Sequence, residues 1–257
     1  MASAPASSFS ASLTGLANPS RFMDLSGRVL PWLVALTAVL LLFGLWLAFF
    51  VAPADYQQGD TARIMFIHVP SAWLSLLLYT MMAVSALGTL VWRHPLADVA
   101  QKAAAPLGAA FAFLCLVTGS LWGKPMWGAF WVWDARLTSM LVLFLMYCGI
   151  LALWRTIEEP GRAARAVAIL TLVGVVNIPI IKFSVDWWNT LHQPAGVLKL
   201  SGSAVDPSIL WPLLEMAVAF TLLALTLHLV GMRTEILRRR VRTLTILAAE
   251  RAEREAA

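Results

Sequence analysis

Two histidines occur in matching local patterns on either side of a tryptophan-rich segment. They are His68, in the sequence His-Val-Pro, and His192, in the sequence His-Gln-Pro. A proline restricts the residue before it to extended backbone, so we expect each histidine in a stiffened loop close to a membrane surface. Neutral imidazole is the commonest protein ligand of metals. The alternative is that each imidazole only forms a hydrogen bond within its own loop.

The segment between these histidines carries four of the 12 tryptophans, Trp122, Trp127, Trp131 and Trp133. Indole rings bind large flat ligands through their faces. A helix would place the second and third of them on one face, whereas an extended segment would align the last two. Beside two imidazoles, such a platform suits haem, with the iron ligated from both faces. A belt of tryptophans that anchors the chain at a membrane surface is the alternative.

Asp134 and Arg136 close the tryptophan segment. A guanidinium group matches a carboxylate with two parallel hydrogen bonds, so Arg136 is a candidate partner for a haem propionate. Asp134 is a candidate to orient a neighbouring donor. The structural alternatives are that Asp134 caps the helix that follows and that Arg136 forms a salt bridge with it. The remaining histidines, His94 and His228, are expected near the opposite membrane surface with structural roles only.

The composition is that of a polytopic membrane protein. The 257 residues are 60% hydrophobic and 13% charged, with a mean hydropathy of +0.77, whereas soluble domains carry about 25% charged residues. The basic residues flank the apolar runs, which indicates membrane topology and not nucleic-acid binding. Cys115 and Cys148 lie inside apolar runs without a CxxC or CxxCH motif, which argues against thiol exchange and covalent haem attachment. The chain also lacks a Walker motif for ATP.

Six apolar runs predict an all-α fold with six transmembrane helices, since each crossing needs about 20 apolar residues. The runs cover residues 31–52, 70–92, 104–121, 137–154, 166–183 and 209–230. We expect a loose N-terminal segment over 1–29, a six-helix domain over 30–230 with a tryptophan-rich loop at 122–136, and a basic tail over 231–257. Pro31 should lie in the first turn of the first helix, and Pro179 should kink the fifth.

The distribution of lysine and arginine predicts the orientation. Only five of the 19 basic residues lie on the side of the tryptophan-rich loop: Arg63, Lys124, Arg136, Lys182 and Lys199. The side with more lysine and arginine faces the cytoplasm, so both termini should be cytoplasmic. In the tail, Leu237, Val241, Leu244 and Ala248 recur at helical spacing among arginines. This pattern is typical of an amphipathic helix that binds either anionic lipid or a cytoplasmic partner.

The motif around the tryptophans resembles a known family. Trp127-Gly-x-x-Trp131-x-Trp133-Asp134, followed by Arg136-Leu-Thr-Ser139, is similar to the "WWD" signature of the haem-handling proteins of cytochrome c maturation. The chain length, the six spans and one outer histidine on each side of the motif resemble the CcmC branch of that family. The sequence from Asn177 to Pro194 also resembles it. The similarity covers about residues 30–230.

The resemblance implies a membrane protein that handles and transfers haem, without an ATPase of its own and without enzymatic activity. His68 and His192 would be the axial ligands of the iron in haem b, which is carried transiently as cargo, and the tryptophan-rich loop would be its platform. The family acts in the bacterial inner membrane. It presents haem at the periplasmic face to the haem chaperone CcmE, beside the ABC transporter subunits CcmA and CcmB and the small protein CcmD.

Two other classes of protein fit the residues less well. A quinone-linked haem redox subunit usually holds its haem between histidines inside helices, whereas both outer histidines are expected in loops. A permease for a hydrophobic solute needs polar residues along a path through the bilayer. Only Asn177, Lys182 and Glu215 are available for such a path. A haem spectrum of the purified protein distinguishes these classes.

Overall fold

The computed structural model describes residues 18–192 and 205–256. Over these residues the chain is all-helical without any strand, and six segments are long and apolar enough to cross a membrane. The predicted fold class and number of spans are therefore confirmed. The six segments are Pro19–Val51, Asp60–Leu90, Ala97–Trp127, Ala135–Thr156, Pro160–Trp187 and Pro207–Ala256. The expectation of a loose N-terminal segment is wrong from residue 19 onward, because these residues form the start of the first helix. Residues 1–17 lie outside the described residues.

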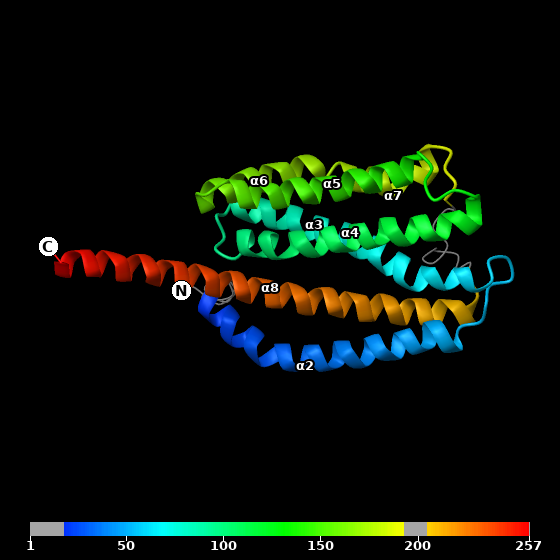
Figure 1. Cartoon of the computed structure of the whole chain (residues 1–257), viewed down its shortest axis with the longest axis horizontal. Coiled ribbons are helices and arrows are strands. Elements are labelled where there is room, and N and C mark those ends of the chain that lie inside the picture. Colours follow the sequence, from blue (N-terminus) through cyan, green and yellow to red (C-terminus); the bar gives the residue numbers. More distant parts are fainter. Residues whose placement is uncertain (1–17, 193–204, 257) are drawn as a thin grey trace, which may run out of the picture.

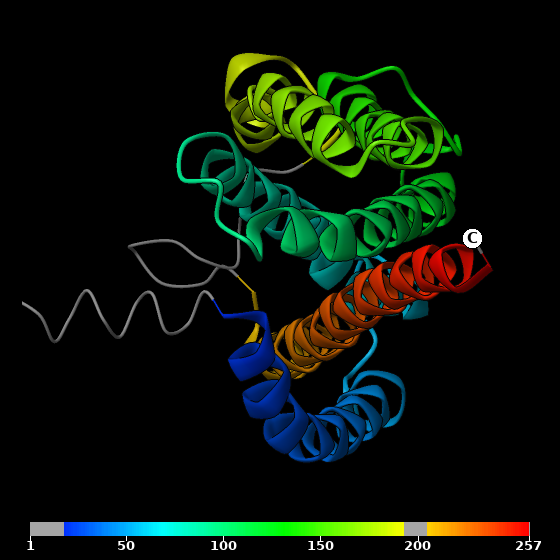
Figure 2. The same cartoon turned by 90° about the vertical axis from the view of Figure 1, so that its left-hand side faces the viewer.

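The helices run side by side along the long axis of the molecule (Figure 1). Their bounds are α2 Pro19–Trp46, α3 Met65–Leu90, α4 Ala97–Trp127, α5 Ala135–Thr156, α6 Pro160–Gly174, α7 Asn177–Trp187 and α8 Pro207–Ala256. A π-helical turn, η1 Leu47–Val51, extends α2, and a 3₁₀ turn, η2 Asp60–Ile64, precedes α3. Viewed toward one end, α3 and α4 lie between α5, α6 and α7 on one side and α2 and α8 on the other (Figure 2).

The two ends of the bundle differ in what they carry. The N-terminal end of α2, the C-terminal end of α8 and the short α3–α4 and α5–α6 connections lie at one end, which we call the terminal end (Figure 1). The connection from α2 to α3, the connection from α4 to α5 and the end of α7 lie at the other, which we call the loop end. The tryptophan-rich motif is therefore on the opposite side of the bundle from both termini.

A pair of tyrosines ties the middle layer of the bundle to α5. The rings of Tyr79 in α3 and Tyr147 in α5 meet edge to face, with 5.2 Å between centroids. The Tyr147 hydroxyl donates a 2.7 Å hydrogen bond to the Ser75 carbonyl. Both rings are fully buried, and a buried hydroxyl needs such a partner. This packing holds α3 and α5 at a fixed separation beneath the loop end.

Two prolines correct the expected helix limits. The first helix begins at Pro19, behind an N-cap at Asn18, so Pro31 lies inside α2 and not in its first turn. Pro179 does not kink a continuous fifth helix, because that span is divided into α6 and α7 by a break at 175–176. A proline ring clashes with the carbonyl of the residue four positions earlier, here Val175. The break therefore falls one turn before Pro179, which lies in the first turn of α7.

The sixth span and the basic tail form one helix. α8 runs for 50 residues from Pro207 to Ala256 without interruption. The predicted tail helix is confirmed, but no change of structure marks the expected boundary at 230–231. At about 1.5 Å per residue, this helix is about 75 Å long, more than twice the roughly 30 Å hydrocarbon layer.

Candidate functional site

The tryptophan-rich motif is helical in its first half and non-helical in its second. α4 continues to Trp127, so Trp122 and Trp127 are helical residues, and the expected loop at 122–136 shortens to the connection between Trp127 and Ala135. The helix ends where Gly128 adopts a left-handed conformation, with φ of 76°, which glycine adopts without steric cost. Trp131 and Trp133 lie in the non-helical connection, where the Asp134 N–H turns back to the Val132 carbonyl at 2.8 Å. A shared helix face for Trp127 and Trp131 is therefore not found, because the helix ends at Trp127.

His68 lies in a helix, so its expected position in a loop is wrong. The 3₁₀ turn η2 leads directly into α3, which places His68 in the first turn of that helix and Pro70 just after it. A proline this close to the start removes one backbone hydrogen bond without ending the helix. A quinone-linked redox subunit also ligates its haem from within helices. The argument against that class of protein, which assumed that both histidines lie in loops, therefore does not hold for His68.

The His68 ring is fixed against α4. Its Nδ1 lies 3.1 Å from the Cys115 carbonyl oxygen and 3.1 Å from the Thr118 hydroxyl. A carbonyl only accepts, so Nδ1 carries the proton. The Thr118 hydroxyl donates to the Leu114 carbonyl at 2.6 Å and so accepts from His68 as well. A Cβ at Gly119 would lie 2.9 Å from Cε1 of His68, so α4 needs glycine there for the ring to fit.

His192 is fixed by Asp134. The His192 Nδ1 lies 3.2 Å from Oδ2 of Asp134, and the same oxygen accepts the Leu191 N–H at 3.3 Å. The other oxygen, Oδ1, accepts the Leu137 N–H at 2.7 Å, which caps the N-terminus of α5. The capping role of Asp134 is therefore confirmed. One buried carboxylate joins the start of α5 to the chain after α7.

The surroundings of His192 favour its neutral form. Burial lowers the pKa of His192 more than the hydrogen bond and the negative charge of Asp134 raise it, and the charge of Arg136 lowers it further. His192 is therefore neutral at pH 7 and bears a lone pair on the nitrogen that Asp134 does not bind.

The two histidines share one arrangement. In each ring Nδ1 is the donor, to a carbonyl for His68 and to a carboxylate for His192. Within residues 18–192 and 205–256, Nε2 of neither ring has a hydrogen-bond partner. Histidines that ligate metals almost always donate the other ring N–H to a carbonyl or carboxylate, which fixes the tautomer and the ring orientation.

A tryptophan of α4 lies against each histidine. Trp122 meets His68 edge-on with 5.7 Å between ring centroids, and Trp127 meets His192 with 5.0 Å. The indole N–H of Trp122 donates a 2.8 Å hydrogen bond to the Gln58 side chain in the α2–α3 connection. The sequence gives no signal for Gln58, because 64 residues separate it from its partner.

Trp131 and Trp133 form part of the wall of an apolar groove between α4 and α5. The rings of Trp131 and Trp133 meet edge to face with 5.4 Å between centroids. The groove has a volume of about 390 Å³, and its walls are made by Phe113, Leu116, Trp131, Trp133, Leu141 and Phe144. These side chains offer an apolar aromatic surface and no charge, which suits the face of a large flat ligand.

Arg136 binds α7 and not Asp134. Its Nε donates to the Ser184 hydroxyl at 3.1 Å, and Nη2 lies 3.4 Å from the carbonyl oxygens of Ile181 and Lys182. No ion pair joins Arg136 to Asp134 in the described part of the chain, so that alternative is not found. These contacts hold α5 against α7. They also place the Arg136 cation where its charge lowers the pKa of His192.

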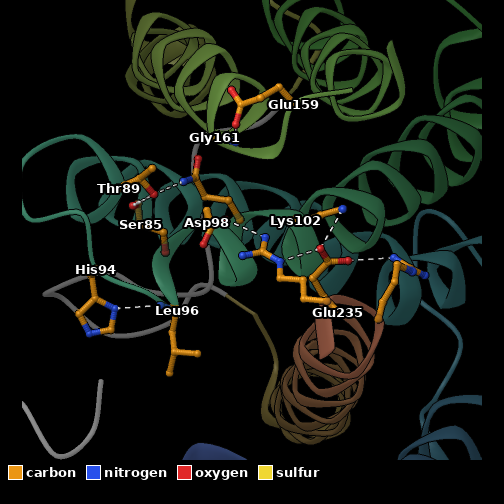
Figure 3. Close-up of polar contacts among 12 residues, drawn as sticks. Ser85, Thr89, His94, Leu96, Asp98, Lys102, Glu159, Gly161 and Glu235 are labelled. Atoms are coloured by element: carbon orange, nitrogen blue, oxygen red, sulfur yellow. Dashed lines mark hydrogen bonds and ion pairs between the residues drawn. The ribbon is translucent and has the colours of Figure 1, made fainter. Parts of the chain in front are cut away.

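The other two histidines lie away from this site. His94 is in the α3–α4 connection at the terminal end (Figure 3). His228 is buried within α8, one turn before Met232, which packs with the start of α4. Among the predicted site residues, the structure thus brings together the two outer histidines, Trp122, Trp127, Asp134 and Arg136. Trp131 and Trp133 flank them on the side of the groove.

The chain is similar to proteins of one family along most of its length. The family model "Heme exporter protein C" (CcmC) matches residues 12–247. The "Heme exporter protein C" of Bradyrhizobium diazoefficiens is 66% identical over 93% of this chain and 90% of its own length. That of Escherichia coli K12 is 50% identical over 86% and 89%. A "putative cytochrome c biosynthesis ccmC-like mitochondrial protein" of Marchantia polymorpha is 45% identical over 80% and 87%.

Proposed function

The chain belongs to the haem exporter protein C (CcmC) family of cytochrome c maturation, and from this premise we propose that it binds haem b at the periplasmic face of the inner membrane and delivers it to the haem chaperone CcmE. The family assignment and the six apolar helices make it a multi-pass membrane protein of haem transport. Haem is its cargo, and transfer without an enzymatic reaction is its activity.

One observation carries this proposal: both outer histidines present Nε2 while Nδ1 is held by an acceptor. In the proposed complex, His68 and His192 are the two axial ligands of the iron. The porphyrin supplies the four equatorial nitrogens, so two imidazoles complete the coordination. His68 is held by α4 through Cys115 and Thr118, and His192 is held by Asp134. The two ligands are therefore oriented before haem arrives, which lowers the cost of ordering them.

The tryptophans and Arg136 complete the proposed site. Trp122 and Trp127 support the two ligand rings, and Trp131 and Trp133 offer apolar aromatic surface to the porphyrin beside the groove. Nη1 of Arg136 has no hydrogen-bond partner among the described residues. We assign it to a haem propionate, because guanidinium binds carboxylate through charge-assisted hydrogen bonds.

Delivery requires that the haem be bound only through groups at the loop end. A ligand pair that lies at the membrane surface can be exchanged for a ligand of a periplasmic chaperone, whereas a haem buried at mid-membrane cannot be reached. The chain has no phosphate-binding Walker motif, so we assign energy coupling to the ABC subunits CcmA and CcmB, with CcmD as a further partner. The proposed organisation places the haem-handling domain at 30–230, flanked by cytoplasmic segments at 1–29 and 231–257.

Transfer to the chaperone tests this function. The purified chain, loaded with haem, is mixed with apo-CcmE, and the haem on each protein is followed by its absorption spectrum after separation. We expect haem to pass to the chaperone from the native chain and from a Trp32→Ala control, which alters an exposed tryptophan far from the site. Haem that stays on the chain in every preparation would indicate a resident redox group and would contradict delivery.

Thiol labelling tests the orientation. In a variant without Cys115 and Cys148, a cysteine is placed at Tyr56, which is 91% exposed at the loop end, or at Glu158, which is exposed in the α5–α6 connection. We expect a membrane-impermeant reagent to label the cysteine at position 56 in intact cells, while position 158 reacts only after lysis. The opposite pattern would place the haem site in the cytoplasm.

A further inference from the structure

The last part of α8 is a helix that touches nothing else in the described chain. Every residue from Val241 to Ala256 is exposed, and the helix extends well past the ends of the other helices at the terminal end (Figure 1). A lone helix of this length is only marginally stable in water, since most helical stability in proteins comes from packing of an apolar face. The segment is therefore a helix without a packing partner in the described part of the chain.

A cluster of charges fixes the direction in which α8 leaves the bundle. The buried carboxylate of Glu235 accepts from Lys102 of α4 at 2.9 Å and from Arg239 at 3.0 Å (Figure 3). Arg239 also reaches Asp98 in the first turn of α4 at 2.7 Å. Arg238 forms a third contact with Glu235 at 2.9 Å. We call these five residues the Glu235 cluster. It holds α8 to α4 at the point of exit.

A second set of contacts holds the same region to α2. Arg233 donates to the Ser26 hydroxyl at 2.7 Å and to the Met23 carbonyl, and Arg240 donates to the Ser20 hydroxyl at 3.1 Å. With α4 on one side and α2 on another, the exposed segment continues along the axis of α8, away from the bundle. It cannot lie along a membrane surface unless these contacts break, which disfavours anionic lipid as its partner.

The exposed segment carries an apolar seam with coiled-coil spacing. Leu237, Val241, Leu244 and Ala248 follow one another at intervals of four, three and four residues, which is the pattern of the contact positions of a heptad. The first three are 48%, 62% and 65% exposed. Leaving this seam in water is unfavourable, and a facing helix would bury it.

The charges beside the seam select the partner. Between Leu237 and Ala249 the chain has four arginines and no carboxylate, and two of them, Arg238 and Arg240, occupy the positions that flank a coiled-coil seam. Two copies of this protein in one membrane send their tails in the same direction, so only parallel pairing is possible. Parallel pairing would set arginine against arginine along this stretch, which opposes a homodimer.

We propose that residues 237–248 of α8 are a docking site for an acidic amphipathic helix of another protein on the same side of the membrane as both termini. The partner helix buries apolar residues against the seam and places glutamate or aspartate beside Arg238 and Arg240. The inference does not depend on haem binding at the loop end, so either can fail without the other.

Position-specific cross-linking in cells tests this docking site. A photoreactive residue replaces Val241, Leu244 or Ala248 on the seam, or Thr243, Ile246 or Glu250 on the other faces, in the full-length chain in its native membrane. We expect the three seam positions to link to one segment of another protein, identified by mass spectrometry, with more acidic than basic residues. Equal yields at all six positions, links to a second copy of this chain, or links to lipid alone would each overturn the proposal.

A matched pair of variants tests the seam by its energetics. Leu244→Asp places a charge on the seam, whereas Ile246→Asp places the same charge on the opposite face, where the native side chain is 50% exposed. Removing a hot-spot residue at the centre of an interface reduces binding about thirtyfold or more, which corresponds to about 2 kcal/mol. We expect Leu244→Asp to reduce the link from position 241 by that factor and Ile246→Asp to leave it unchanged. Equal effects with unchanged thermal stability would contradict the seam.

Discussion

The two polar regions of this protein, one at each end of the bundle, satisfy their hydrogen bonds differently. In the Glu235 cluster both carboxylate oxygens accept, and every charged group has a partner of opposite sign within 3.0 Å. At the loop end, each of two histidines uses one ring nitrogen for an anchoring hydrogen bond. Neither Nε2 has a hydrogen-bond partner in the described part of the chain. The first region satisfies the ion pairs of its buried carboxylate within the chain, whereas the second leaves one ring nitrogen of each histidine without a partner there.

His94 sharpens this contrast within one residue type. Its Nδ1 accepts the backbone N–H of Leu96 at 3.2 Å in the α3–α4 connection (Figure 3). The neutral ring therefore carries its proton on Nε2, which is then a donor and not a metal ligand. His68 and His192 hold the opposite tautomer, because their Nδ1 atoms face acceptors. The hydrogen bond that each ring makes thus decides which of its nitrogens keeps a free lone pair.

The largest effect on haem binding is expected from the tryptophans at the loop end. Aromatic contacts are worth about 0.5–1.5 kcal/mol each beyond burial, so replacing Trp127, Trp131 and Trp133 together by alanine should cost about 3 kcal/mol, or roughly a hundredfold in haem affinity. Haem titration of the purified variant measures this loss. As a control, alanine at Trp32 and Trp92, both exposed and far from the loop end, should leave the affinity unchanged. Full haem affinity in the triple variant would reduce the motif to a membrane anchor.

The Glu235 cluster should affect stability and not haem. Removing one partner of a buried ion pair leaves uncompensated charge and costs up to about 3–5 kcal/mol. Because Lys102 and Arg239 are partly exposed, we expect Glu235→Ala to lower the free energy of unfolding by about 2 kcal/mol, less than that range. Denaturant unfolding in detergent measures this change, with the exposed Glu250→Ala as the control. A loss of haem affinity in Glu235→Ala would show that the two ends of the bundle are coupled. It would contradict the view that the Glu235 cluster and the loop end act separately.

Asp134 should act on haem through His192. Asp134→Asn keeps an oxygen that caps α5, but it places an amide NH2, which donates, where Oδ2 accepts the Nδ1–H of His192. Loss of such an outer partner typically reduces metal affinity by about tenfold or more, so we expect about a tenfold lower haem affinity with unchanged thermal stability. The same change at Asp206, which caps the start of α8, should not affect haem. An unchanged affinity would mean that Asp134 acts only as a helix cap.

The smallest effect is expected from pH. Haem competes with protons for the imidazole lone pair, so affinity falls once the pH drops through the pKa of the free ligand. Burial lowers the pKa of His192, and the neutral ring therefore persists to a lower pH than an ordinary histidine. An unshifted imidazole would lose affinity about fourfold between pH 7.5 and 6, given a pKa near 6.5. We expect the part of the haem affinity that depends on His192 to fall by less than fourfold over this pH range. That part is measured by comparing the haem affinities of the native chain and His192→Ala at each pH. A loss larger than fourfold would require a raised pKa and contradict the buried site.

Much of the fold was predictable because membrane spans are set by length and apolarity. The six apolar runs correspond to the six spanning segments. Most of their ends are displaced by up to about three turns, and the end of the sixth, at Ala256 and not 230, by about seven turns. The predicted ends were placed at the limits of the apolar runs, whereas the helices continue through the polar residues and prolines beside them. Trp122 and Trp127 continue α4 because no residue stops it before Gly128. His68 belongs to α3 because the 3₁₀ turn at Asp60–Ile64 leads directly into the helix, which begins at Met65.

Candidate site residues could be selected from the sequence, but their contacts could not be predicted. Residue type and matched spacing selected the two outer histidines and the motif between them. The partners that fix the rings come from distant positions: Cys115 and Thr118 for His68, and Asp134 for His192. Arg136 had an obvious partner two residues away, yet it binds Ser184 of α7. Such pairings follow from how helices pack, which the local pattern does not encode.

The iron spectrum of the histidine variants tests the account most directly. With His68 and His192 as axial ligands, the bound haem is six-coordinate and low-spin in the native chain. We predict that His68→Ala and His192→Ala each give five-coordinate, high-spin iron, that added imidazole restores the low-spin spectrum, and that His94→Ala is unchanged. Low-spin spectra that persist in both outer variants without imidazole would show that other residues ligate the iron.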